Sequence, residues 1–119
     1  MERYYSLYSE NLVSQNGIEV LRGVDALRGR YESELAAFPD LTIECKRVLV
    51  DERTQTLAAE NLERGTHRGD LILGDERLAP TGRKMELHGG LFMVLDEDGR
   101  IAEMSEYIDS SQLLSQLRP

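Results

Sequence analysis

The chain has 119 residues, of which 40% are apolar and 30% charged, and its formal net charge is -8. This length suits one domain around one hydrophobic core, and the composition is that of an ordinary globular protein. The acidic balance argues against a nucleic-acid partner, which would need a clustered excess of lysine and arginine, and no apolar run is long enough to span a membrane.

The single cysteine, Cys45, excludes an internal disulfide and is typical of a protein in a reducing compartment. Its alternation with Leu41 and Ile43 predicts a small buried side chain on a strand face. The first five residues contain no apolar stretch of the kind found in secretory signals. We therefore expect a cytoplasmic protein that forms a single domain over residues 1–119.

The first 20 residues fit two short elements. Residues 4–8, rich in tyrosine, could form a short helix, and residues 11–15 a short edge strand. The first clear periodicity follows Gly23, where apolar residues recur every three or four positions and predict an amphipathic helix. Its apolar stripe consists of Val24, Leu27, Tyr31, Leu35 and Phe38. Pro39 ends this helix, because a proline disfavours helical backbone at the preceding residue.

After Pro39 the apolar period changes from 3.6 to 2, which indicates a strand. Apolar side chains up to Cys45 share one parity, whereas Val48 and Val50 share the other. Such a change of phase predicts a bulge or bend in a long strand. Residues 51–53 then form a predicted turn, and a second strand is expected over residues 54–66.

Glycine and proline interrupt residues 65–82, which we interpret as strand, short excursion and turn. A strand is predicted over residues 84–95, a tight turn over 96–99 and a last strand over 100–109. Ser110 could then cap a short helix. One helix followed by four or more strands joined by tight turns predicts an α+β fold with a curved antiparallel sheet.

Four blocks of sequence resemble those of the SnoaL-like proteins, a group within the nuclear transport factor 2-like superfamily. Residues 64–70, RGTHRGD, followed by Gly74 and by APTGRK at 79–84, resemble the pattern GTHxG…G…PTG. Two further blocks agree in order and spacing, namely FPDL at 38–41 and DGRIAE at 98–103, the latter followed by Asp109 and by QL at 116–117. The resemblance covers residues 17–117.

This resemblance implies a cone-shaped α+β fold, in which a bent antiparallel sheet wraps around an apolar pocket closed by helices. It also implies a homodimer formed through the sheet and a small hydrophobic ligand. The best-known members are polyketide cyclases, which close a ring by intramolecular aldol condensation without a metal or an organic cofactor. Relatives include hydratases, isomerases, epoxide hydrolases, hydroxylating homologues and non-catalytic modules, so the fold alone does not fix the function.

The sequence departs from the group in two ways. Members usually carry one or two further helices before the point where this chain begins, and those helices help to close the pocket. The final strand usually carries a tryptophan, whereas this chain has none and Ser105 lies in that region. We therefore expect a pocket that is more open or covered by a partner subunit, or a natural start further upstream, and a pocket wall that is smaller or more polar.

The resemblance points to Asp109 as the catalytic general acid/base, because an aspartate near the end of the last strand has this role in the cyclases. A carboxylate in an apolar pocket has a raised pKa, which suits it to remove a proton α to a carbonyl. The sequence Asp109-Ser110-Ser111 is equally typical of a helix N-cap. Both interpretations of Asp109 stay open at this point.

Four further side chains are candidates for substrate binding: Tyr107, His88, Phe92 and His67. Tyr107 shares the parity of Asp109 on the last strand, and His88 shares that of Phe92 on the strand before it. Either polar face could instead meet solvent, and His67, which belongs to the GTH signature, could be a structurally bonded histidine. No cluster of cysteine and histidine has the spacing of a metal site, so we expect none.

Two functions remain from this reading. The chain is either a cofactor-independent cyclase or isomerase acting on a small hydrophobic carbonyl compound, or a non-catalytic module that binds a small ligand or forms dimers.

Overall fold

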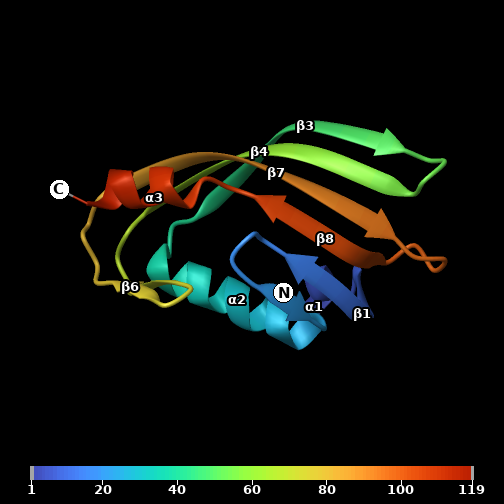
Figure 1. Cartoon of the computed structure of the whole chain (residues 1–119), viewed down its shortest axis with the longest axis horizontal. Coiled ribbons are helices and arrows are strands. Elements are labelled where there is room, and N and C mark those ends of the chain that lie inside the picture. Colours follow the sequence, from blue (N-terminus) through green and yellow to red (C-terminus); the bar gives the residue numbers. More distant parts are fainter. Residues whose placement is uncertain (1, 119) are drawn as a thin grey trace.

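The computed structural model describes residues 2–118 of the chain. A curved sheet arches over the long helix α2 (Val24–Ala37), and the short helix α3 (Ser110–Leu117) lies at one end of the sheet (Figure 1). The turns that join β3 to β4 and β7 to β8 both project from the opposite end. No helix within the described range combines the length and the apolar character needed to span a bilayer.

The main sheet has six strands in the order β2-β1-β8-β7-β4-β3. They are β1 (Tyr8–Gln15), β2 (Val20–Arg22), β3 (Thr42–Asp51), β4 (Thr56–Thr66), β7 (Lys84–Leu95) and β8 (Ile101–Tyr107). The last four of these pair antiparallel, as the sequence predicts. The expected edge strand at residues 11–15 is corrected, because β1 lies between β2 and β8 and pairs parallel with β8. The sheet is therefore curved and mixed.

The predicted change of phase in the first long strand is a bulge. The pairing of β3 with β4 shifts between Cys45 and Arg47. On either side of the shift, Ile43 lies opposite Glu63 and Val48 opposite Ala59, so that side chains of opposite parity on β3 face the same way. Cys45 itself is exposed, which corrects the expectation of a buried thiol, because every residue of the edge strand β3 is exposed.

The helices confirm most of the sequence pattern. The short α1 (Glu2–Tyr5) precedes β1, and α2 begins directly after Gly23, whose φ of 87° favours glycine. Along α2, Leu27 and Ala37 are buried, whereas Leu35 is 38% exposed. The predicted apolar stripe is therefore only partly correct.

Two clusters of buried side chains make up the core. One lies between α2, β1 and β8 and centres on Leu12, Leu27 and Met104. The other lies under α3 and the hairpin formed by β5 (Leu71–Leu73) and β6 (Glu76–Leu78). Its buried members are Ala37, Phe38, Leu71, Met85, Leu87, Leu113 and Leu117. The second cluster forms one wall of the cavity described next.

Candidate functional site

A cavity of about 370 Å³ lies between α2, the sheet and the β5–β6 hairpin. This volume is near the lower end of the range for small-molecule sites, roughly 300–1,000 Å³. Most of its wall is apolar and includes Phe38, Leu41, Leu71, Met85, Leu87, Ile108 and Leu113. The remaining section of the wall is polar and charged, in contrast to the apolar pocket that the resemblance implies.

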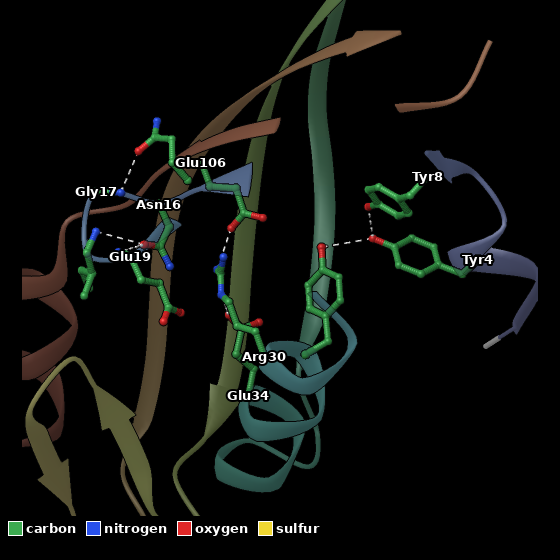
Figure 2. A network of polar contacts seen from close by, with 11 residues as sticks. Tyr4, Tyr8, Asn16, Gly17, Glu19, Arg30, Glu34 and Glu106 are labelled. Atoms are coloured by element: carbon green, nitrogen blue, oxygen red, sulfur yellow. Dashed lines mark hydrogen bonds and ion pairs between the residues drawn. The ribbon is translucent and has the colours of Figure 1, made fainter. Parts of the chain in front are cut away.

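The polar section of the wall combines side chains from three parts of the chain. Arg30 and Glu34 lie one turn apart on α2, Glu63 projects from β4, and Glu19 comes from the connection between β1 and β2. The connection is held by Asn16, whose side-chain oxygen accepts hydrogen bonds from the backbone N–H groups of residues 18 and 19, each at 2.9 Å. Figure 2 shows Arg30 and Glu34 on α2, with Asn16 and Glu19 of the connection beside them.

Arg30 is the centre of a buried ion-pair network. Its Nη2 atom lies 2.7 Å from Oε2 of Glu106 on β8, and its Nε atom donates to Oε1 of Glu34 at 3.0 Å (Figure 2). The Arg30 side chain is only 13% exposed. Burial alone would lower the pKa of Arg30, but the two carboxylates outweigh it and hold this pKa above its ordinary value. Arg30 therefore stays charged and is largely neutralised by the protein itself.

Glu63 is a carboxyl group of a different kind. It lines the cavity and has no hydrogen bond or ion pair with any residue in the described part of the chain. Burial, together with the nearby carboxylates of Glu34 and Glu106, raises the pKa of Glu63 to about 7 against the opposing effect of Arg30. At neutral pH this group exists in both its acid and its base form, which is the property required of a general acid/base catalyst.

The position of Glu63 follows from the pairing of β4 with β7. Glu63 lies opposite Leu87, a buried residue of the cavity wall, whereas its neighbours Leu62 and Arg64 lie opposite His88 and Glu86. Side chains opposite one another in a ladder share a face of the sheet. Glu63 is therefore directed to the face that the cavity occupies.

Sequence reasoning missed Glu63, because both parities of residues 57–64 contain polar and apolar side chains. A signal was nevertheless present on the helix. Arg30 and Glu34 are three and seven residues after Leu27, a spacing that places this charged pair on the same helical face as the buried leucine. A charged pair on the apolar face of a helix is typical of a polar site in the interior.

A cluster of tyrosines lies beside this network and fixes α1 and β1 against α2. The hydroxyl groups of Tyr4 and Tyr8 are hydrogen-bonded at 2.6 Å, and that of Tyr4 donates to Tyr31 at 3.1 Å (Figure 2). Burial raises the pKa of both Tyr8 and Tyr31 above its usual range. These groups therefore stay protonated and act as hydrogen-bonding anchors.

Asp109 lies outside the cavity wall and is the N-cap of α3. Its carboxylate accepts hydrogen bonds from the backbone N–H groups of Ser111 and Gln112, at 3.0 and 3.2 Å, and from the Ser111 hydroxyl at 2.6 Å. These bonds, the Ser111 hydroxyl first, hold the pKa of the exposed Asp109 below its ordinary value. The N-cap interpretation of Asp109 is thus confirmed, and its environment is the opposite of the apolar one expected for a catalytic base.

The pocket position expected for Tyr107, His88 and Phe92 is corrected. None of the three is in the cavity wall, and each is exposed. The rings of Phe92 and Tyr107 lie with their centroids 6.3 Å apart on one face. Their neighbours along the chain include the wall residues Leu87 and Ile108, and successive side chains of a strand point to opposite faces.

His67 is fully buried and is held by contacts within the protein. The backbone N–H of Thr81 donates to its Nδ1 atom at 3.2 Å, and its ring lies 5.5 Å from that of Phe38. Its backbone N–H and C=O pair with Arg83 and Gly82, which joins the two halves of the GTH and PTG signature. His67 is not among the residues of the cavity wall. Residues 2–118 contain no group of three or more acidic, histidine or cysteine side chains arranged to hold a metal ion.

The sequence matches the family profile of the SnoaL-like polyketide cyclases over residues 1–117. No curated protein gives a significant match.

Solved structures show the same fold. A protein of Jannaschia sp. CCS1, assigned as a SnoaL-like polyketide cyclase, superposes with a TM-score of 0.86 at 15% identity, over 99% of this chain and 79% of that one. AclR of Streptomyces galilaeus, assigned as a hydroxylase, gives 0.76 at 25% identity, over 94% of this chain and 66% of that one. IdmH of Streptomyces antibioticus, assigned as a polyketide cyclase, gives 0.76 at 23% identity, over 94% and 82%.

Proposed function

The chain belongs to the SnoaL-like polyketide cyclase family, and from that premise we propose that it is an acid/base enzyme, a cyclase or isomerase acting on a small, largely apolar carbonyl compound. The substrate occupies the cavity beneath the sheet, and Glu63, in place of Asp109, is the general acid/base. The observation that carries this proposal is the carboxyl group of Glu63, which lines a mostly apolar cavity without a hydrogen-bond partner in the described part of the chain.

The chemistry needs one group that can accept and return a proton. In its ionised form Glu63 removes a proton from the carbon α to the substrate carbonyl, and the electron pair of that C–H bond moves to give an enolate. The enolate carbon then attacks a second carbonyl carbon, or is protonated at another position, and the proton held by Glu63 returns to the resulting oxyanion or carbon. A pKa near neutrality suits both halves of this cycle.

Arg30 supports the same reaction from the neighbouring wall. Its Nη1 atom is buried and has no hydrogen-bond partner in the described part of the chain, although Nε and Nη2 are both bonded. A small shift of the guanidinium would bring the Nη1 donors to an enolate oxygen, where charge develops during the reaction. The two carboxylates that hold Arg30 would keep it in position for this role.

The proposal can be tested without knowledge of the natural substrate. We expect the protein to accelerate exchange of the α-hydrogens of 2-tetralone for deuterium in D₂O, measured by proton NMR at pD 7. Glu63→Gln removes the titrating group at nearly constant volume and should reduce the protein-dependent rate at least tenfold, since general acid/base catalysis contributes roughly 10²–10⁴-fold. Glu97→Gln, a change in the exposed β7–β8 turn, is the control for lost charge and should leave the rate unchanged. Equal rates for wild type and Glu63→Gln would refute this role of Glu63.

A second candidate function is a non-catalytic module that binds a small ligand or forms dimers. It is favoured by exposed apolar side chains on one face of the sheet, those of Leu49, Phe92 and Tyr107. Exposed apolar patches of this kind mark interaction surfaces. We propose a homodimer through this sheet for either function, which light scattering tests directly: Leu49→Lys should convert a dimer into a monomer.

A further inference from the structure

The polar section of the cavity wall carries an excess of negative groups. Its ionisable side chains are three carboxyl groups, from Glu19, Glu34 and Glu63, and a single guanidinium, from Arg30. A fourth carboxylate, that of Glu106, is bonded to Arg30 from the sheet. Even with Glu63 protonated, the remaining carboxylates outnumber the one cation.

Arg30 offsets only part of this excess for a ligand, because Nη1 is the one nitrogen of its guanidinium without a partner among the described residues. Its Nη2 atom is engaged by Glu106 at 2.7 Å and by Glu34 at 3.0 Å. An anionic ligand in the cavity would therefore meet a cation whose charge is largely neutralised, with the unpaired carboxyl groups of Glu19 and Glu63 in the same wall. Like charges at short range in a partly buried site repel strongly, so this wall disfavours a carboxylate or a phosphate.

Two of the carboxyl groups are available to a ligand. Glu19 and Glu63 have no ion pair or side-chain hydrogen bond with any residue in the described range. Glu19 is exposed and follows the turn held by Asn16, so it lies where solvent reaches the site, and Glu63 lies deeper on β4. Figure 2 shows the Glu19 side chain directed to the side of Arg30 and Glu34, consistent with the electrostatic effect of Glu19 on Glu34.

We infer that the ligand of this cavity carries a protonated amine, or another cationic nitrogen, which binds between Glu19 and Glu63 while its hydrocarbon part contacts the apolar wall around Leu87 and Met85. The inference rests on the proposed function in one respect, since it takes this cavity as the substrate site. The site is defined by a cavity with a mostly apolar wall as well as by its carboxyl groups. An ammonium group would supply the positive charge that the wall lacks and donate hydrogen bonds to both free carboxyl groups.

Such a ligand would also prepare Glu63 for catalysis. A positive charge next to a carboxyl group favours its ionised form. Binding of the amine should therefore release a proton from Glu63 and leave the base form beside the substrate. In an aminocarbonyl substrate the same ammonium group makes the adjacent C–H more acidic. Recognition and activation would then use one set of residues.

The test compares three compounds with one ring system: 2-aminotetralin, 2-tetralone and tetralin-2-carboxylate. Isothermal titration calorimetry at pH 7 and low salt should give a dissociation constant for the amine at least tenfold lower than for the ketone, and no binding of the carboxylate. The heat of amine binding should change with the ionisation enthalpy of the buffer, because a proton is released. That of the ketone should not.

Two variants test whether Glu19 and Glu63 cause the preference for the amine. Glu19→Gln, at an exposed position where the fold tolerates the change, should reduce the advantage of the amine over the ketone at least threefold, and Glu19→Gln combined with Glu63→Gln should abolish it. Glu97→Gln should leave it unchanged. Binding of the carboxylate as tightly as the amine, an amine preference that survives in the double variant, or binding of none of the three would overturn the inference. Exchange of 2-tetralone is measured separately. If the amine preference is absent while exchange still depends on Glu63, only this inference is refuted. If the amine preference is present but exchange does not depend on Glu63, only the proposed function is refuted.

Discussion

The Arg30 guanidinium on α2 reaches the Glu106 carboxylate on β8, with 2.7 Å between Nη2 and Oε2, and so links the helix to the sheet across the end of the cavity. Both side chains are largely buried, at 13% and 16% exposure. Removing one partner of a buried pair leaves the other charge without compensation, which is costly. We expect Arg30→Met to lower the free energy of unfolding by about 2–4 kcal/mol in urea titrations.

A matched control distinguishes this network from an ordinary ion pair. Arg64 and Glu86 form an ion pair at 3.0 Å but are more than half exposed, so Arg64→Met should lower the free energy of unfolding by less than about 1 kcal/mol. Adding Glu106→Gln to Arg30→Met should recover part of the loss, because it removes the stranded carboxylate. A cost for Arg30→Met no larger than that for Arg64→Met would contradict this description of the network.

Glu63 should make the stability of the protein depend on pH. Its pKa is raised from 4.5 to about 7, so the folded protein holds this proton more tightly than the unfolded chain does. Between these two values the unfolded chain ionises first, and the free energy of unfolding falls as the pH rises. Below about pH 4.5 Glu63 is protonated in both the folded and the unfolded state, so it no longer makes the free energy of unfolding depend on pH.

Glu63→Gln removes this dependence. Relative to wild type, the variant should gain roughly 1–3 kcal/mol in the free energy of unfolding between pH 5 and pH 8. The measurement is a pair of urea titrations of each protein at the two pH values, and taking the difference cancels the other titrating groups. A difference between the two proteins that does not change with pH would show that Glu63 has an ordinary pKa.

Asp109 should contribute to stability and not to proton transfer. Asp109→Ala removes the acceptor for the first N–H groups of α3 and should lower Tm by roughly 2–6 °C, whereas Asp109→Asn keeps a capping oxygen and should cost less. Thermal melts followed by circular dichroism measure both. Exchange of 2-tetralone should stay within twofold of wild type in the Asn variant, and a tenfold loss there would restore Asp109 as the acid/base group.

Gly69 in the GTH signature is fixed by a close backbone approach. A Cβ atom at this position would lie 2.0 Å from the carbonyl oxygen of Ala36, and the Gly69 N–H donates to the carbonyl of Ala37 at 3.1 Å. Gly69→Ala should therefore lower the free energy of unfolding by about 1–3 kcal/mol or more. Gly29, within α2, has open space around its Cα, so Gly29→Ala should raise stability by about 0.5–1 kcal/mol. If Gly69→Ala and Gly29→Ala changed the free energy of unfolding by the same amount, this explanation would be wrong.

Local patterns in the sequence predicted the elements well. The apolar period located α2, the reversal of parity after Cys45 located the bulge in β3, and the signature around Gly69 indicated the family. These features depend on neighbours in the chain. The position of β1 in the sheet could not be predicted from local patterns, because its parallel pairing with β8 joins segments about 90 residues apart.

The candidate site was predicted less well, for a physical reason. Whether a charged side chain on a strand faces a cavity or solvent depends on which face of the sheet the helix covers, and alternation alone cannot decide this. Glu63 and His88 illustrate the point: each is adjacent to a residue of opposite orientation, and the structure directs only Glu63 to the cavity. The raised pKa of Glu63 arises first from burial and then from the carboxylates of Glu34 and Glu106, which lie far away in sequence.

The most direct test of the central claim is the pH profile of α-hydrogen exchange in 2-tetralone, after subtraction of the rate without protein. If Glu63 is the catalytic base, the wild-type rate should rise through an apparent pKa of about 7 and then level off. Glu63→Gln should show no such rise, while Glu97→Gln should follow wild type. A wild-type profile with its midpoint near 4.5, or one that is unchanged in Glu63→Gln, would contradict the account.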